Sequence, residues 1–253
     1  MKNIRIIPQL NIKGPNVVKP VNTEGLKVVG NPRDLAMRYY QEGADEIIYL
    51  DVVASLYQRN LDFDQLKKVC AGIFIPFTVG GGIRSLDDIN NALRAGADKI
   101  AINTYAVNNP NFISRAIKIF GSQCIVLFVE AKRTGNKKWE AYTDGGREKT
   151  GVDAIEWIKK AIKLGVGEIL ITSVDHDGRR QGYEIDLMKE IASFSPVPVI
   201  AHGGAGTPEM IKEVILEGRA DAVSASSILH YGEYSLKEIK RHLAGNNINV
   251  RLI

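Results

Sequence analysis

The sequence predicts a single eight-stranded parallel α/β barrel. Short runs rich in Ile and Val alternate with amphipathic stretches eight times within 253 residues, which is the pattern of a (β/α)8 TIM barrel. The pattern also occurs twice, because residues 43–51 return in similar form as residues 165–173. No Pro-, Ser- or Gly-rich linker divides the chain. We therefore expect one domain built from two half-barrels, roughly residues 1–121 and 122–253.

An open, doubly wound sheet is the alternative architecture. That fold would place one glycine-rich turn after its first strand. In this chain the glycine turns follow the third and the seventh predicted strands, at residues 80–82 and 203–206. This position favours the closed barrel.

The predicted strands are continuous apolar runs, which suit a parallel sheet covered by helices; they span residues 4–12, 46–52, 74–79, 98–103, 124–130, 167–172, 197–202 and 220–225. Amphipathic helices are predicted between them, most clearly at residues 32–44, 85–96, 153–165, 207–218 and 234–245. Prolines suited to a first helical turn and glycines suited to a helix end support these assignments; they are Pro32, Pro110, Pro208, Gly43, Gly96, Gly165 and Gly218.

Composition excludes several classes of function. The net charge of +4 is spread along the chain, so no nucleic-acid partner is expected. Cys70 and Cys124 are far apart in apolar surroundings, as reduced thiols of a cytoplasmic protein would be. No apolar run has the length of a membrane span or signal peptide, and the histidines lack metal-ligand spacing. We expect neither a membrane partner, nor a metal, nor an organic cofactor.

Two glycine-rich turns predict two phosphate sites at opposite sides of the barrel mouth. Glycines let backbone N–H groups approach an anion closely, and a following helix N-terminus adds a favourable dipole. The first site would comprise Gly81, Gly82, Asn103 and Thr104, and the second Asp177, Gly178, Gly203, Gly204, Ala225 and Ser226. Such a pair suits an elongated ligand with a phosphate at each end. The alternative is that these glycines only terminate strands.

Motifs from all parts of the chain resemble the cyclase subunit of imidazole glycerol phosphate synthase; they include residues 6–8, 78–84, 96–99, 102–104, 120–123, 167–173 and 203–206. The resemblance implies a heterodimer in which a glutaminase supplies ammonia. It also implies conversion of a ribulosyl bisphosphate intermediate to imidazole glycerol phosphate and aminoimidazole carboxamide ribotide. A sister isomerase shares the half-barrel repeat, but Phe120-Gly121-Ser122-Gln123 and the Glu168 segment are more similar to the cyclase.

The two catalytic aspartates of that family correspond to Asn11 and Glu130 in this sequence, which are also symmetry mates in the repeat. Glu130 can exchange protons, although its carboxylate lies one methylene further from the backbone. Asn11 can hydrogen-bond but cannot act as a general base. Asp51 or His176 would then have to take over that role.

Four further residues are expected at the barrel mouth, and three of them have two interpretations. The resemblance implies that Lys19 reaches over the substrate from the loop after the first strand, whereas a solvated loop lysine is the plain alternative. Asp177 is either a ligand contact or a cap, and Thr172 is a candidate ligand contact. His202 at the end of the seventh strand would narrow the second phosphate site or add a titratable group there.

Charged residues mark the opposite end of the predicted barrel; Arg5, Glu46, Lys99 and Glu168 stand at the starts of four strands. Any barrel could use such alternating charges as a polar plug. The resemblance implies instead an ammonia gate, with Asp98 and Gln123 facing the partner. The leading hypothesis is therefore an ammonia-dependent cyclase, a carbon–nitrogen lyase of histidine biosynthesis. The alternatives are a paralogue that passes ammonia to a surface-polysaccharide sugar, and a non-catalytic subunit that activates the glutaminase.

Overall fold

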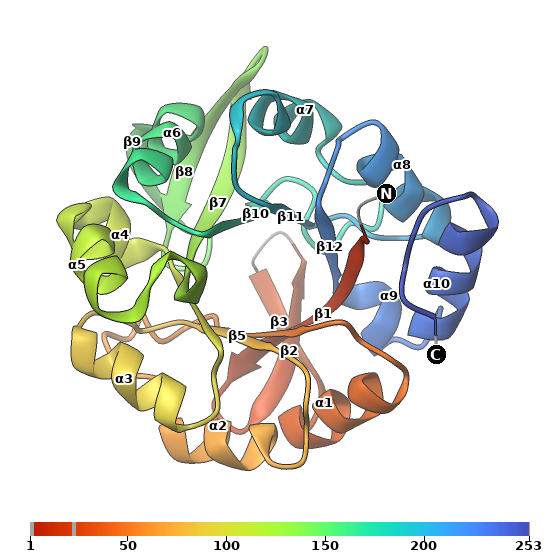
Figure 1. Ribbon diagram of the computed structural model, residues 1–253, viewed down its shortest axis with the longest axis horizontal. Coiled ribbons are helices and arrows are strands. Elements are labelled where there is room, and N and C mark those ends of the chain that lie inside the picture. Colours follow the sequence, from red (N-terminus) through yellow and green to blue (C-terminus); the bar gives the residue numbers. More distant parts are fainter. Residues whose placement is uncertain (1–2, 22–23, 253) are drawn as a thin grey trace.

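The computed structural model describes residues 3–21 and 24–252. In this part of the chain eight parallel strands close into a barrel, confirming the predicted fold class (Figure 1). They are β1 (Arg5–Lys13), β4 (Ile47–Asp51), β5 (Phe77–Gly80), β6 (Lys99–Ile102), β7 (Ile125–Gly135), β10 (Glu168–Ser173), β11 (Val199–His202) and β12 (Ala222–Ala225). The pairing of β1 with β12 and of β7 with β10 leaves the parallel sheet without a free edge.

Helices cover the outside of the barrel (Figure 1). They are α1 (Pro32–Gln41), α2 (Phe63–Cys70), α3 (Leu86–Arg94), α4 (Thr104–Asn108), α5 (Asn111–Phe120), α6 (Ala154–Leu164), α7 (Ile185–Phe194), α8 (Pro208–Leu216), α9 (Ser227–His230) and α10 (Leu236–Gly245), with a 3-10 turn η1 (Ser122–Cys124). Pro32 and Pro208 begin their helices as predicted. Pro110 instead occupies the N-cap of α5.

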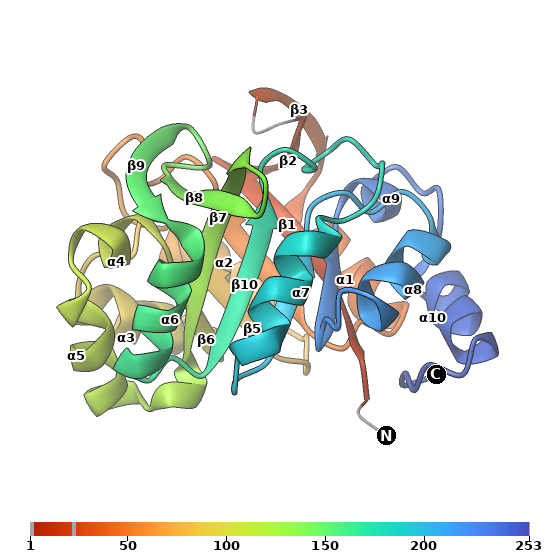
Figure 2. The ribbon, with the colours of Figure 1, turned by 90° about the horizontal axis from the view of Figure 1, so that it is seen from above.

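Two β-hairpins extend from the barrel, and both were missed from the sequence. The first, β2 (Asn16–Val21) with β3 (Glu24–Gly30), replaces the loop expected after the first strand. The second, β8 (Lys138–Thr143) with β9 (Glu148–Asp153), follows β7. Figure 2 shows both hairpins on the side of the molecule away from the N-terminus. They follow the first strand of each half of the repeat.

Strand boundaries also differ from the prediction, for example at the start of the third barrel strand and at the end of β7, which extends to Gly135. The third barrel strand begins at Phe77 rather than at residue 74. Phe74 lies in the preceding connection with 85% of its surface exposed. The apolar run of residues 74–79 therefore predicted a strand start that is three residues too early, because an apolar residue such as Phe74 can also face solvent.

The barrel interior contains an apolar layer between its two open ends. Its side chains alternate along the strands with those that face the helices; they are Ile7, Ile48, Leu50, Ala101, Val126, Leu170, Ile200 and Ala222. A larger apolar core fills the space between strands and helices. Among residues 3–21 and 24–252, no helix combines the length and hydropathy needed to cross a bilayer, and no His, Cys, Asp or Glu cluster suits a metal ion.

Candidate active site

Three adjoining cavities form a trough across the mouth of the barrel, at the carboxyl ends of the strands. The cavity of the first half has a volume of about 330 Å³, the central one about 30 Å³ and that of the second half about 10 Å³. Glu130 and Phe128 border both the first and the central cavity. Asp177 and His202 border both the central and the second cavity.

The trough brings together the residues predicted to bind phosphate or take part in catalysis, with the exception of His176. The first cavity is lined by Asp51, Gly81, Gly82, Asn103, Thr104 and Glu130. Asn11, Glu130, Thr172 and Asp177 line the central cavity. The second cavity is lined by Lys19, Asp177, Gly178, Gly203, Gly204, Ala225 and Ser226. Residues of both halves therefore line neighbouring cavities at one mouth of the barrel.

Glu130 ends the inward-facing row of β7 and is buried. Its Oε2 accepts a hydrogen bond from Asn103 Nδ2 at 2.8 Å. Burial raises the pKa of Glu130 to about 8, despite the opposing effect of a hydrogen bond from the Gly146 backbone. At neutral pH this carboxyl is therefore largely protonated and can donate a proton.

Asn11 lies across the central cavity and is also buried. Its Oδ1 accepts a hydrogen bond from Gln9 Nε2 at 2.9 Å, and Ser224 Oγ donates to Gln9 Oε1 at 3.5 Å. These contacts use the amide oxygen of Asn11 and leave its Nδ2 as the donor for a ligand. Sequence reasoning missed Gln9, although alternate residues of a strand share a face.

Lys19, Asp177 and His202 form a buried polar group at the second cavity. Lys19 Nζ pairs with Asp177 Oδ1 at 2.8 Å, so the interpretation of Lys19 as a solvated lysine is wrong. Burial acts to raise the pKa of Asp177, but the charge of Lys19 and the neighbouring His202 side chain, whose Nε2 lies 3.6 Å from Asp177 Oδ1, outweigh it and lower that pKa. Asp177 is thus an anion within the trough.

The two candidate substitutes for a general base differ in position. Asp51 lies in the first cavity, where Arg59 NH2 contacts its Oδ2 at 2.7 Å. Burial raises the pKa of Asp51 although Arg59 opposes it. His176 lines none of the described cavities, because its Nδ1 contacts Gly182 O at 2.7 Å and its Nε2 lies 3.5 Å from Glu184. The structure thus brings Asp51, and not His176, to the trough.

The glycines of both turns are required by backbone contacts within the chain. Gly81 has φ +98°, and a Cβ there would lie 2.3 Å from Asp51 O. Gly204 has φ +108°, and a Cβ there would lie 1.9 Å from Gly182 O. Both values exclude an ordinary side chain. Strand termination and close loop packing therefore account for these glycines, alongside any role toward an anion.

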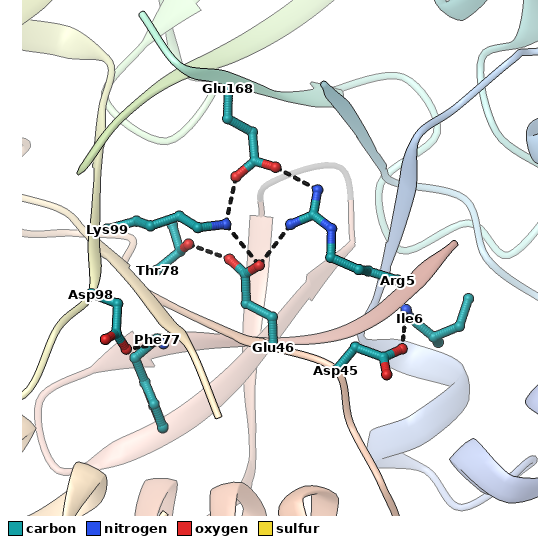
Figure 3. A network of polar contacts seen from close by, with 9 residues as sticks. All are labelled: Arg5, Ile6, Asp45, Glu46, Phe77, Thr78, Asp98, Lys99 and Glu168. Atoms are coloured by element: carbon teal, nitrogen blue, oxygen red, sulfur yellow. Dashed lines mark hydrogen bonds and ion pairs between the residues drawn. The ribbon is translucent and has the colours of Figure 1, made fainter. Parts of the chain in front are cut away.

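A closed ring of charges fills the opposite end of the barrel (Figure 3). Arg5 contacts Glu46 at 2.7 Å and Glu168 at 2.5 Å. Lys99 contacts the same carboxylates at 2.9 and 2.8 Å, and Thr78 Oγ1 also donates to Glu46. The four residues predicted to form a gate are thus in direct contact, next to the apolar layer.

The surface around this ring has two further features. Asp98 accepts a hydrogen bond from Phe77 N at 2.8 Å (Figure 3), while Gln123 is exposed. Three large apolar side chains, Phe74, Ile119 and Leu216, are exposed in the segments that lead into β5, η1 and β12. Because these segments precede parallel strands, they lie at the same end of the barrel as the ring.

Comparison with known proteins gives consistent matches over the whole chain. A family model described as histidine biosynthesis protein matches residues 5–235. Proteins of two Dehalococcoides mccartyi strains, named imidazole glycerol phosphate synthase subunit HisF, are each 48% identical over 252 residues, 100% of this chain and 99% of the relative. A protein of the same name from Legionella pneumophila is 54% identical over 209 residues, 83% of this chain and 99% of the relative.

Proposed function

Because the chain belongs to the family of imidazole glycerol phosphate synthase cyclase subunits, we propose that it uses ammonia to close an imidazole ring. The substrate would be a ribulosyl bisphosphate intermediate, and the products imidazole glycerol phosphate and aminoimidazole carboxamide ribotide. The observation that best supports this proposal is the row of three adjoining cavities, with a glycine turn at each end and a titratable carboxyl between them. The reaction is that of a carbon–nitrogen lyase, and the expected compartment is the cytoplasm.

Ammonia would enter at the end of the barrel opposite the trough. The ring of Arg5, Glu46, Lys99 and Glu168 stands between solvent and the apolar layer, so a neutral molecule could pass only where these ion pairs separate. Exposed Phe74, Ile119 and Leu216 offer apolar contact area around this opening. Asp98 and Gln123 belong to the same face. We propose that a separate glutaminase docks here as a heterodimer partner.

Glu130 supplies the proton chemistry in this proposal. Ring closure needs a proton donor and a proton acceptor near the reacting atoms, and such a group contributes roughly 100- to 10,000-fold in rate. With its pKa raised to about 8, Glu130 is protonated at neutral pH and acts as the acid. Asn11, whose oxygen is engaged by Gln9, donates a hydrogen bond to a substrate oxygen. Lys19 and the two glycine turns bind the substrate phosphates, and Asp51, which lines the first cavity together with Glu130, is the candidate for the base.

The proposal is tested with ammonium salt and the bisphosphate substrate. The native chain should form imidazole glycerol phosphate, and Glu130→Gln should lower kcat by about 100-fold or more with KM little changed. Asp186→Asn, at a carboxylate half exposed on α7, is the matched control. Equal turnover of native and Glu130→Gln chains would contradict the proposed role of Glu130.

Asn11 favours a second candidate function, in which ammonia passes to a different acceptor such as a surface-polysaccharide sugar. An amide at this position cannot accept the proton that an aspartate would take. If the native chain forms no product while Asn11→Asp does, the scaffold is competent and the natural acceptor is a different molecule. If neither forms product but the chain stimulates a glutaminase, the subunit acts on its partner alone.

A further inference from the structure

His202 is a buried histidine that borders the trough and lacks one hydrogen-bond partner. It ends β11 with 4% of its surface exposed. Its Nδ1 lies 3.0 Å from Ser224 Oγ. Within the described part of the chain, Nε2 has no hydrogen-bond partner, and Asp177 Oδ1 lies 3.6 Å away. A buried polar atom without a partner is uncommon in a folded protein and calls for an explanation.

The internal repeat places His202 at a position that a glycine occupies in the first half of the barrel. The turn at Gly203 and Gly204 repeats the turn at Gly81 and Gly82, so His202 corresponds to Gly80. The cavity of the first half, which Gly81 and Gly82 line, holds about 330 Å³, whereas the cavity that His202, Gly203 and Gly204 line holds about 10 Å³. The smaller volume is enough for about one water molecule. The imidazole, with the Lys19 side chain, therefore makes the two ends of the trough chemically different.

Charges around His202 indicate what its Nε2 is suited to bind. The single hydrogen of the Ser224 hydroxyl can turn from Gln9 Oε1, which is 3.5 Å away, to Nδ1, which is nearer at 3.0 Å. The anionic Asp177 favours the tautomer whose proton is on Nε2. Lys19 Nζ shares the same Asp177 oxygen at 2.8 Å. Both donors thus converge on one acceptor at the border of the second cavity. A phosphate entering there would meet repulsion from Asp177, which two such donors can offset.

We propose that His202 is a specificity-determining residue for the second phosphate of the ligand, to which its Nε2–H donates after Lys19 turns from Asp177 to that phosphate. This inference rests on the proposed function only for the expectation that the ligand carries two phosphates. It gives the second end of the trough a side-chain donor at the position that Gly80 occupies in the first half of the repeat.

The test compares variants that keep or remove the donor. His202→Gln retains a side-chain N–H donor, whereas His202→Leu removes the donor at similar size. His242→Leu, at a partly exposed histidine of α10, is the matched control. Inorganic phosphate is titrated by calorimetry, and the two phosphates of the bisphosphate substrate are followed by phosphorus NMR. We expect the native, His202→Gln and His242→Leu chains to bind two phosphates. His202→Leu should bind the second about 10-fold or more weakly, with the first unchanged.

Three results would overturn the inference. A single phosphate bound by the native chain would exclude a second site, and unchanged binding by His202→Leu would exclude donation by the imidazole. Tighter binding of the second phosphate by His202→Leu would show that the imidazole obstructs the second site and does not bind the phosphate. Should His202→Leu not fold, the nitrogen NMR signal of His202 Nε2 in the native chain decides, because it must shift when phosphate is added. Phosphate binding without any ring closure would refute the proposed reaction and leave the inference standing.

Discussion

At the scale of the residue, the environment of a side chain in this barrel decides what its chemistry is. Glu130 is a strand-end carboxyl by sequence, but burial changes it into a proton donor at neutral pH. Asn11 is an amide that could present either of its ends, and Gln9 leaves the donor end for a ligand. The identities of Asn11 and Glu130 were readable from the sequence, whereas neither the raised pKa nor the contact with Gln9 was.

Replacement of Glu130 by Gln is expected to stabilise the fold at high pH while it removes activity. Below pH 4.5 the carboxyl is protonated in both the folded and the unfolded chain, so it contributes no pH dependence. From pH 4.5 to about 8 the unfolded chain releases the proton while the folded chain retains it. The native chain therefore loses stability by about 1.4 kcal/mol per pH unit in this window.

The measurement is urea denaturation of the native and Glu130→Gln chains at pH 5 and pH 8. The stability difference between them should grow in favour of Glu130→Gln as pH rises. A difference that is equal at the two pH values would show that burial does not disfavour ionisation of Glu130.

At the scale of the element, the same contact occurs at three places in the barrel. An aspartate just before one strand accepts a hydrogen bond from the backbone of the neighbouring strand. Asp45 accepts from Ile6 N at 2.8 Å, Asp98 from Phe77 N at 2.8 Å, and Asp221 from Val199 N at 2.7 Å. Each contact fixes where a barrel strand begins. This hydrogen bond gives Asp98 a structural role within the chain, in addition to the proposed contact with a glutaminase.

Asp98→Ala is expected to destabilise the chain by about 1–3 kcal/mol, because the Phe77 N–H loses its acceptor at a partly buried site. Asp87→Ala, at an exposed position in the first turn of α3, is the matched control and should cost less than about 1 kcal/mol. Equilibrium denaturation measures both. Equal effects of the two substitutions would show that the contact with β5 contributes little.

At the scale of the whole molecule, the barrel places charge at its two ends and apolar side chains between them. The ring at one end connects four strands that are distant in sequence, and its carboxylates Glu46 and Glu168 are buried. Each carboxylate contacts both Arg5 and Lys99. The two cations therefore act on the same pair of anions.

A double-mutant cycle tests this shared arrangement. Either Arg5→Met or Lys99→Met leaves one cation for two carboxylates, whereas the double substitution leaves two buried anions without a cation. We expect the double variant to be less stable than the sum of the single effects predicts, by about 1 kcal/mol or more. Additivity within about 0.5 kcal/mol would indicate two independent ion pairs instead of a ring.

The sequence by itself determined the barrel architecture and which strand-end residues meet at its mouth. Apolar strand runs, helix-end prolines and glycines, and the doubled glycine turns are local signals, and in a parallel barrel all strand ends of one polarity meet at one mouth. For that reason Asn11, Asp51, Glu130 and Asp177 could be assigned to a common site before any coordinates were known.

Only the tertiary structure decided how those residues behave. The hairpin that brings Lys19 onto Asp177 and the unequal cavities beside Gly81 and Gly203 depend on contacts between distant segments. The hydrogen bond of Gln9 to Asn11 is local, but it depends on the side-chain conformations that the packed barrel imposes. Burial and hydrogen bonding set the pKa of a side chain and decide which of its polar atoms remain available to a ligand. These effects come from the neighbours that pack around the residue, not from the identity of the residue. A sequence specifies such neighbours only through the fold as a whole.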